Sequence, residues 1–284
     1  MRKKLIAGGS LLVVVLAAGY VFRGPIRDAW SAWTAPKLPE AVKYVPEPLG
    51  TGLTEGDAGV VEGGVSTSEN YAIVTVPPPQ PKAKDPLENR GPLPTEANLA
   101  IPFMTQAPFA NWEYPYQEAC EEASAIMVDA FYDGETGRIS DEVAKARIDT
   151  LVEYENKELG FYKDTTAEET AEFLREYFGY RNVVILPVNS ADEIRRVVAN
   201  GYPVILPASG KLLENPNFRN GGPLYHMFVV KGYTDDKRFI TNDPGTRNGA
   251  NFLYTEENLM ESIHDWNGGD VLNGKKVMIV VLPN

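Results

Sequence analysis

The chain has 284 residues, a formal net charge of −12, one cysteine and two histidines. The five basic residues before position 28 carry +5, so the remainder carries −17. Such an acidic body repels nucleic acid and anionic lipid, so we expect no nucleic-acid partner. One cysteine excludes an internal disulfide, and neither the histidine spacing nor a cysteine cluster is typical of a zinc site. We therefore expect neither a metal nor another cofactor.

The N-terminus is typical of a membrane-spanning segment. Arg2, Lys3 and Lys4 precede an uncharged run over residues 5–22, which is close to the ~20 residues needed to cross a bilayer. The basic flank favours an N-terminus inside the cell. We expect residues 1–27 to form a single-pass anchor in the cell membrane, with the rest extracytoplasmic. Small residues at 17–19 leave open cleavage as a signal sequence, which would make the protein secreted.

Residues 28–97 are rich in proline, glycine, serine and glutamate, with the sequence PPPQP at 77–81. This composition predicts an acidic linker that holds the following domain away from the membrane. Residues 98–284 are long enough for one domain with its own core.

Within residues 98–284 the pattern runs from helices to strands. Apolar periodicity and capping signals predict helices at 118–133, 141–157, 166–179, 190–201 and 256–264. Runs of β-branched and aromatic residues predict strands at 183–186, 204–206, 225–233, 238–242 and 276–282. Helices followed by mostly antiparallel strands indicate an α+β fold.

Cys120 stands where a polar turn leads into the first of these helices. A thiolate at a helix N-terminus is stabilised by the partial positive charge of free backbone N–H groups, so we expect a lowered thiol pKa and a nucleophile. The charges of Glu121 and Glu122 oppose this effect. The alternative interpretation is a buried cysteine that packs as a small apolar residue.

His226 and Asp243 lie on two successive predicted strands. If Asp235 and Asp236 form the centre of a hairpin turn, Phe228 lies opposite Asp243. His226 and Asp243 then share one face of the sheet as diagonal neighbours, roughly 7–8 Å apart at the backbone, within reach of a side-chain hydrogen bond. A shift of one residue would place Asp243 on the opposite face.

Four motifs in this order resemble a known family: IPFMTQ at 101–106, CEEAS at 120–124, HMFVVKGY at 226–233 and NDP at 242–244. They are similar to the bacteriocin-processing, double-glycine leader peptidase-like family of papain-like cysteine peptidases, over about residues 101–282. The resemblance implies a papain-like fold. It also implies Cys120 as the nucleophile, His226 as the general base and acid, and Asp243 as the orienting carboxylate.

The resemblance further implies that Gln106 donates a hydrogen bond to the oxyanion, together with the backbone N–H of Cys120. Gln117, three residues before Cys120, is the rival donor. His264 is the alternative base, although its place after a short helix is explained by an interaction with the helix dipole.

The sequence therefore predicts an extracytoplasmic, membrane-anchored cysteine peptidase that hydrolyses peptide bonds through a Cys-His-Asp triad and a thioester acyl-enzyme. Its expected partner is a peptide or protein substrate, including the peptide of peptidoglycan. Two alternatives stay open: a peptidoglycan endopeptidase or amidase of related fold, and a catalytically silent peptide-binding domain.

Overall fold

One antiparallel sheet organises the part of the chain that the computed structural model describes, residues 36–46 and 85–284. Its strand order is β2-β7-β3-β4-β5-β6, and β1 pairs with β4 beside this path. The strands are β1 Ala97–Asn98, β2 Asn182–Pro187, β3 Val204–Ala208, β4 His226–Tyr233, β5 Arg238–Asn242, β6 Phe252–Thr255 and β7 Val277–Leu282. Strands β3, β4 and β7 are buried along their whole length, so the centre of the sheet is the centre of the core.

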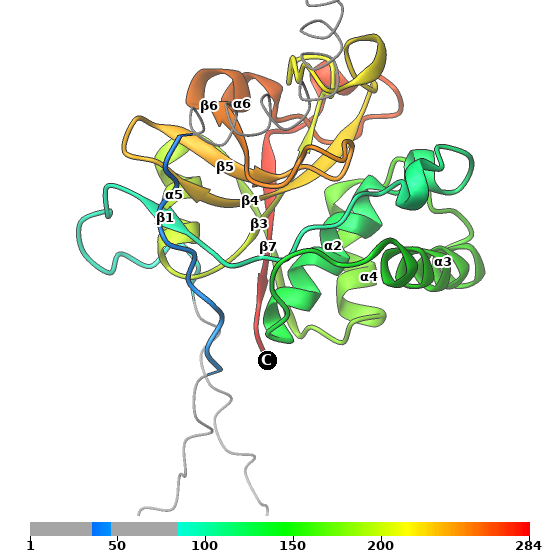
Figure 1. Ribbon diagram of the computed structural model, residues 1–284, viewed down its shortest axis with the longest axis horizontal. Coiled ribbons are helices and arrows are strands. Elements are labelled where there is room, and N and C mark those ends of the chain that lie inside the picture. Colours follow the sequence, from blue (N-terminus) through cyan, green and yellow to red (C-terminus); the bar gives the residue numbers. More distant parts are fainter. Residues whose placement is uncertain (1–35, 47–84) are drawn as a thin grey trace, which may run out of the picture. The chain divides into compact units, whose positions relative to one another are not determined.

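The helices cover this sheet and confirm the expected α+β class. They are α2 Cys120–Tyr132, α3 Asp141–Glu158, α4 Ala167–Glu176, α5 Ala191–Ala199 and α6 Glu256–Ser262. Figure 1 shows α2, α3 and α4 on one side of the sheet and α5 on the other. Helix α2 is buried on almost every side. This position holds its first residue, Cys120, firmly beside the sheet.

Local signals account for most element boundaries. At the start of α4, the Thr166 hydroxyl accepts a hydrogen bond from the Glu169 N–H, and the Glu169 carboxylate accepts one from the Thr166 N–H. This is the reciprocal capping box that the sequence predicts. Strands β1 and β6 were not predicted. Both are short and gain their order from pairing with β4 and β5.

The β4–β5 hairpin differs from the predicted hairpin in two ways, and their effects on the strand register cancel. The turn has three residues, because the Thr234 N–H donates to the Arg238 carbonyl and Lys237 has a left-handed φ of 65°. A bulge between Val230 and Gly232 then shifts the register by one residue.

Beyond the bulge Val229 lies opposite Asn242, which is the predicted register. Asp243 follows β5 directly, and its Oδ1 lies 2.8 Å from His226 Nε2, so His226 and Asp243 meet as this register predicts. The extra residue of the bulge, Lys231, compensates for the longer turn.

Parts of the predicted linker contact the domain. The Val42 N–H donates to the Asn98 carbonyl at 2.9 Å, and the Tyr44 ring packs edge-on against Tyr132, with 4.9 Å between ring centroids. Further along, the Arg196 guanidinium donates to the Gly91 carbonyl at 2.7 Å. Residues 39–46 and 85–97 thus belong to the same compact unit as residues 98–284.

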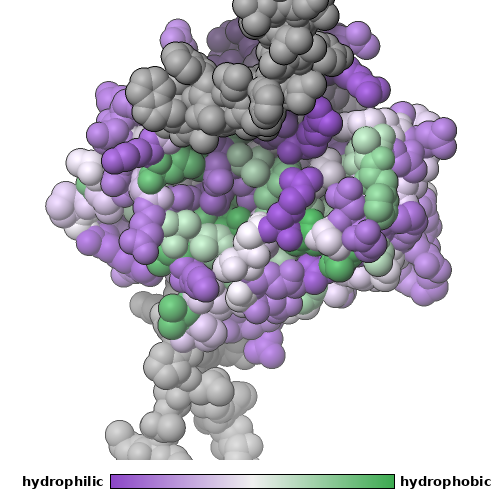
Figure 2. Space-filling model, in the orientation of Figure 1, coloured by the Kyte–Doolittle hydropathy of each residue, from purple (hydrophilic) through white to green (hydrophobic). Residues whose placement is uncertain are grey.

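The predicted anchor, residues 1–27, lies outside the described residues, as does most of the predicted linker. Among the residues that are described, no helix has both the length and the apolar character needed to cross a bilayer. On the face seen in Figure 2, hydrophobic residues are scattered among hydrophilic ones.

Candidate active site

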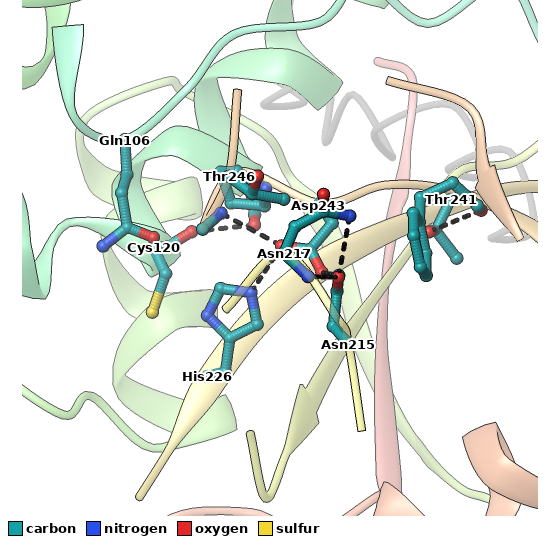
Figure 3. Close-up of polar contacts among 12 residues, drawn as sticks. Gln106, Cys120, Asn215, Asn217, His226, Thr241, Asp243 and Thr246 are labelled. Carbon is teal, nitrogen blue, oxygen red and sulfur yellow. Dashed lines mark hydrogen bonds and ion pairs between the residues drawn. The ribbon is translucent and has the colours of Figure 1, made fainter. Parts of the chain in front are cut away.

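Cys120, His226 and Gln106 line a cleft of about 860 Å³. Cys120 is the first residue of α2, and His226 is the first residue of β4. Figure 3 shows the imidazole of His226 between Cys120 and Asp243, with one ring nitrogen towards Asp243 and the other on the Cys120 side. The fold therefore brings Gln106 and Cys120 close to His226, which lies more than a hundred positions further along the chain.

Asp243 follows β5 directly and is fully buried. Its Oδ1 lies 2.8 Å from His226 Nε2 and accepts the Gly245 N–H at 3.0 Å. Its Oδ2 accepts the Tyr254 hydroxyl at 2.6 Å and the Asn215 amide at 3.1 Å. Burial alone would raise the pKa of Asp243, but His226, the Tyr254 hydroxyl and the Gly245 N–H lower it below its ordinary value. Asp243 is therefore a carboxylate at neutral pH.

Two rings and a glycine hold the imidazole of His226. The Phe218 ring meets it edge-on, with 5.3 Å between ring centroids, and the Phe228 ring lies 6.1 Å away on the same strand. A Cβ at Gly245 would lie 2.8 Å from His226 Cε1, closer than real Cβ contacts allow. Only glycine at 245 lets the loop pass this close to the base.

The ring nitrogen that contacts Asp243 decides the tautomer. With Nε2–H donated to a carboxylate, the neutral imidazole has its lone pair on Nδ1. Nδ1 lies on the Cys120 side in Figure 3.

The sulfur of Cys120 does not have the lowered pKa that its helical position predicts. Burial raises the pKa of the thiol well above its ordinary value, and Glu121, in its ionised form, raises it further. Glu121 Oε2 lies 2.9 Å from Cys120 Sγ. A hydrogen bond from the Met227 backbone N–H acts in the opposite direction. In this fold, burial and neighbouring carboxyls outweigh the helix N-terminus.

Gln106 and Gln117 both lie in the cleft lining. The Gln106 side-chain amide donates to the carbonyls of Tyr116 and Gln117, each at 3.1 Å. The Gln117 amide donates instead to the exposed carboxylate of Glu118 at 2.8 Å. Gln106 is therefore the buried glutamine that ties the cleft wall to the turn leading into Cys120.

The alternative base, His264, is placed elsewhere. Its Nδ1 lies 3.3 Å from the Gly274 carbonyl oxygen, in the loop before β7, and it does not line the cleft. The structure brings His226, and not His264, to the cleft that Cys120 lines.

Two residues that position Asp243 were missed by sequence reasoning. Tyr254 lies on β6, and Asn215 lies in the loop after β3. The run FLYT at 252–255, which follows a turn-forming segment, is a strand signal that would have indicated Tyr254. Asn215 has no such local signal, because only the fold brings its loop to the hairpin.

Two further carboxyls lie near the start of α2, close to Cys120. Glu122 on α2 and Glu155 on α3 are both fully buried, and no amide or hydroxyl of the described residues donates to either carboxyl. Glu122 and Glu155 lie close enough to affect each other's pKa. Burial is the main cause that raises both pKa values, that of Glu155 to about 8.

No group of three or more His, Cys, Asp and Glu side chains within residues 36–46 and 85–284 is arranged to hold a metal ion.

A cysteine at a helix N-terminus, packed against an antiparallel sheet that carries a histidine and an aspartate, defines a papain-like cysteine peptidase. A comparison with family models gives the particular family, because the model of the Peptidase_C39 like family matches residues 98–268. This match covers more than half of the 284 residues. The chain belongs to the Peptidase_C39 like family and is a cysteine peptidase that acts on peptide or protein substrates.

Among solved structures, the chain is similar to a protein from Bacillus anthracis that is described as a C39-like peptidase. The identity is 16% and the TM-score is 0.43, over 66% of this chain and 98% of that chain. No curated protein matches the chain significantly. The family membership rests on the family model.

The Glu122–Glu155 pair makes stability depend on pH. The pKa of Glu155 in the folded chain is about 8, well above that of an unfolded glutamate. At pH values between the unfolded and the folded pKa of Glu155, the folded chain holds a proton on this residue that the unfolded chain has released. The stabilising contribution is therefore complete below the unfolded pKa and is lost as pH rises through about 8.

We expect Glu155→Gln to flatten this dependence, because the amide keeps the shape and does not titrate. Urea unfolding of the wild-type chain should show a free energy that falls by about 1.4 kcal/mol per pH unit per proton across this window. In the variant the free energy of unfolding should fall less steeply with pH, by about 1.4 kcal/mol per pH unit. If the free energies of unfolding of the two proteins changed with pH in parallel, the raised pKa assigned to Glu155 would be wrong.

Proposed function

We propose that Cys120, His226 and Asp243 are the catalytic triad of this peptidase. The observation that carries this proposal is the position of the imidazole, with Nε2 2.8 Å from Asp243 Oδ1 and the other ring nitrogen on the Cys120 side. Such an arrangement supports a fixed tautomer and a direct path for the thiol proton.

In the proposed reaction His226 Nδ1 takes the thiol proton, and the Cys120 thiolate attacks the carbonyl carbon of the scissile peptide bond. The imidazolium then protonates the departing amine, which leaves a thioester on Cys120. Water, deprotonated by His226, attacks the thioester and releases the acid. Asp243 keeps its charge throughout, and its negative charge stabilises the imidazolium.

The oxyanion needs donors, and the Cys120 backbone N–H at the start of α2 is the first of them, since the first N–H groups of a helix have no acceptor within the helix. We propose Gln106 as the second donor. Its amide is buried in the wall of the cleft beside Cys120, whereas the Gln117 amide turns to Glu118. In the resting site Gln106 Nε2 donates to two carbonyls, so one N–H must be shared with the oxyanion.

We also propose that the peptidase domain is extracytoplasmic and anchored in the cell membrane by residues 1–27. The support is the basic flank and the uncharged run over residues 5–22.

The order of the four sequence motifs further supports a leader-processing type of peptidase within the family.

Cys120→Ser should abolish turnover and leave the fold intact, because the hydroxyl is a poor nucleophile here but nearly matches the thiol in size. The measurement is peptide hydrolysis by the full chain on a peptide library, with the thermal midpoint of both proteins as the control. Equal turnover by wild type and variant would exclude Cys120 as the nucleophile.

Gln106→Ala should lower kcat by about 100-fold, since removal of one oxyanion donor typically costs ~10²–10³ in rate. Gln117→Ala is the matched control and should keep kcat within about threefold of the wild-type value. The reverse ranking of the two variants would assign the donor to Gln117.

The full chain expressed in bacterial cells should sediment with membranes, and a C-terminal tag should be digested by protease added to spheroplasts. A variant without residues 2–27 should stay in the cytoplasm and resist digestion. Full protection of the wild-type tag would refute the extracytoplasmic placement, and release of the shortened wild-type protein into the medium would indicate a cleaved signal sequence.

A further inference from the structure

The side chain next to the nucleophile is placed to take part in the reaction. Glu121 is 1% exposed, and its Oε2 lies 2.9 Å from Cys120 Sγ. Its other oxygen, Oε1, accepts the backbone N–H of Thr165 at 3.0 Å. A sulfur and a carboxyl oxygen at this distance have a proton between them, because two unprotonated atoms would repel each other.

The surroundings of Glu121 favour its neutral form. Burial raises its pKa well above the ordinary value, and the charge of Glu122 raises it further. Asp164, in the loop before α4, acts in the same direction. The hydrogen bonds with Cys120 and with the backbone act the other way but do not reverse the shift.

Groups on the neighbouring elements agree with this. Burial raises the pKa of Glu155 on α3, and Glu121, in its ionised form, raises it further. Just before β4, the Tyr225 hydroxyl donates to the Thr165 carbonyl, and burial raises the pKa of Tyr225 well above its ordinary value. His226 lies beyond the sulfur in the same cleft. The groups that act on Glu121 from α2, α3 and the loop before α4 are thus acidic.

Hydrogen-bond accounting then assigns the position of the proton. A neutral carboxyl has one O–H donor, and its other oxygen only accepts. Because Oε1 already accepts the Thr165 N–H, the hydroxyl is on Oε2. The neighbour of Oε2 is Cys120 Sγ, and a buried O–H needs an acceptor. The sulfur is that acceptor.

We propose that Glu121 acts as a neutral carboxylic acid whose hydroxyl donates a hydrogen bond to the Cys120 sulfur, making it a catalytic residue that stabilises the thiolate. The proposal rests on the proposed role of Cys120 as the nucleophile. The sulfur then has two donors, the proposed Glu121 hydroxyl and the Met227 backbone N–H. A neutral donor stabilises a thiolate, whereas a carboxylate in its place would repel it. No proton leaves Glu121 during the reaction, since His226 carries the one that is transferred.

The test compares Glu121→Gln with Glu121→Leu. Glutamine keeps an N–H donor for the sulfur and a carbonyl for the Thr165 N–H, while leucine removes both. The measurements are the pH dependence of Cys120 alkylation by iodoacetamide, and kcat and KM on the peptide that the wild-type chain cleaves best. Glu155→Gln serves as the matched control, because it makes the same change in the same cluster without touching the sulfur.

Glu121→Gln should keep kcat within about tenfold of the wild-type value and leave the alkylation midpoint nearly unmoved. Glu121→Leu should lower kcat by more than tenfold, with little change in KM, and raise the alkylation midpoint by about one pH unit or more, as expected for loss of a hydrogen bond to a charged group.

A loss of more than tenfold in kcat for Glu121→Gln would overturn the proposal, since it would mean that the carboxylate accepts the thiol proton. This result decides the question even if Glu121→Leu fails to fold. If the wild-type chain shows no turnover that depends on Cys120, the proposed function fails instead. The alkylation profiles still report on Glu121 in that case.

Discussion

A carboxylate without exposed surface, Asp243, sets the main constraint on this structure. A buried charge is costly unless hydrogen-bond donors replace the water that it loses. Asp243 has four such donors, from His226, Gly245, Tyr254 and Asn215. They come from β4, the loop after β5, β6 and the loop after β3. The fold must therefore bring four separate segments together before the charge can be buried, and the same assembly orients the imidazole.

The proposed nucleophile, Cys120, is subject to a different balance of charges. A helix N-terminus and the Met227 N–H favour a thiolate, while burial and the carboxyls that follow Cys120 oppose it. These carboxyls form a continuous buried group, from Glu121 beside the sulfur through Glu122 to Glu155 on the next helix. Protons held within this group remove most of the repulsion. In our proposal the reactivity of the sulfur depends on the protonation of Glu121, the one carboxyl of this group that contacts it.

Much of the fold and of the candidate site follows from local signals in the sequence. The capping box at Thr166 places the start of α4, and alternation along β4 and β5 places His226 and Asp243 on one face. The pKa of Cys120 did not follow, because it depends on burial, which the position at a helix N-terminus does not reveal. Asn215 was not predicted either, since it reaches Asp243 across 28 positions of the chain without any periodic pattern.

The three-residue turn at the end of the β4–β5 hairpin has a practical consequence. Asp235, Asp236 and Lys237 are exposed, and the strands are already paired on either side of them, up to Tyr233 and Phe239. Extra residues in this turn would extend into solvent and leave the pairing of both strands unchanged, whereas one extra residue within β5 would turn Asp243 away from the base. The turn is therefore a suitable place for an epitope tag or a fluorophore in a catalytically competent protein.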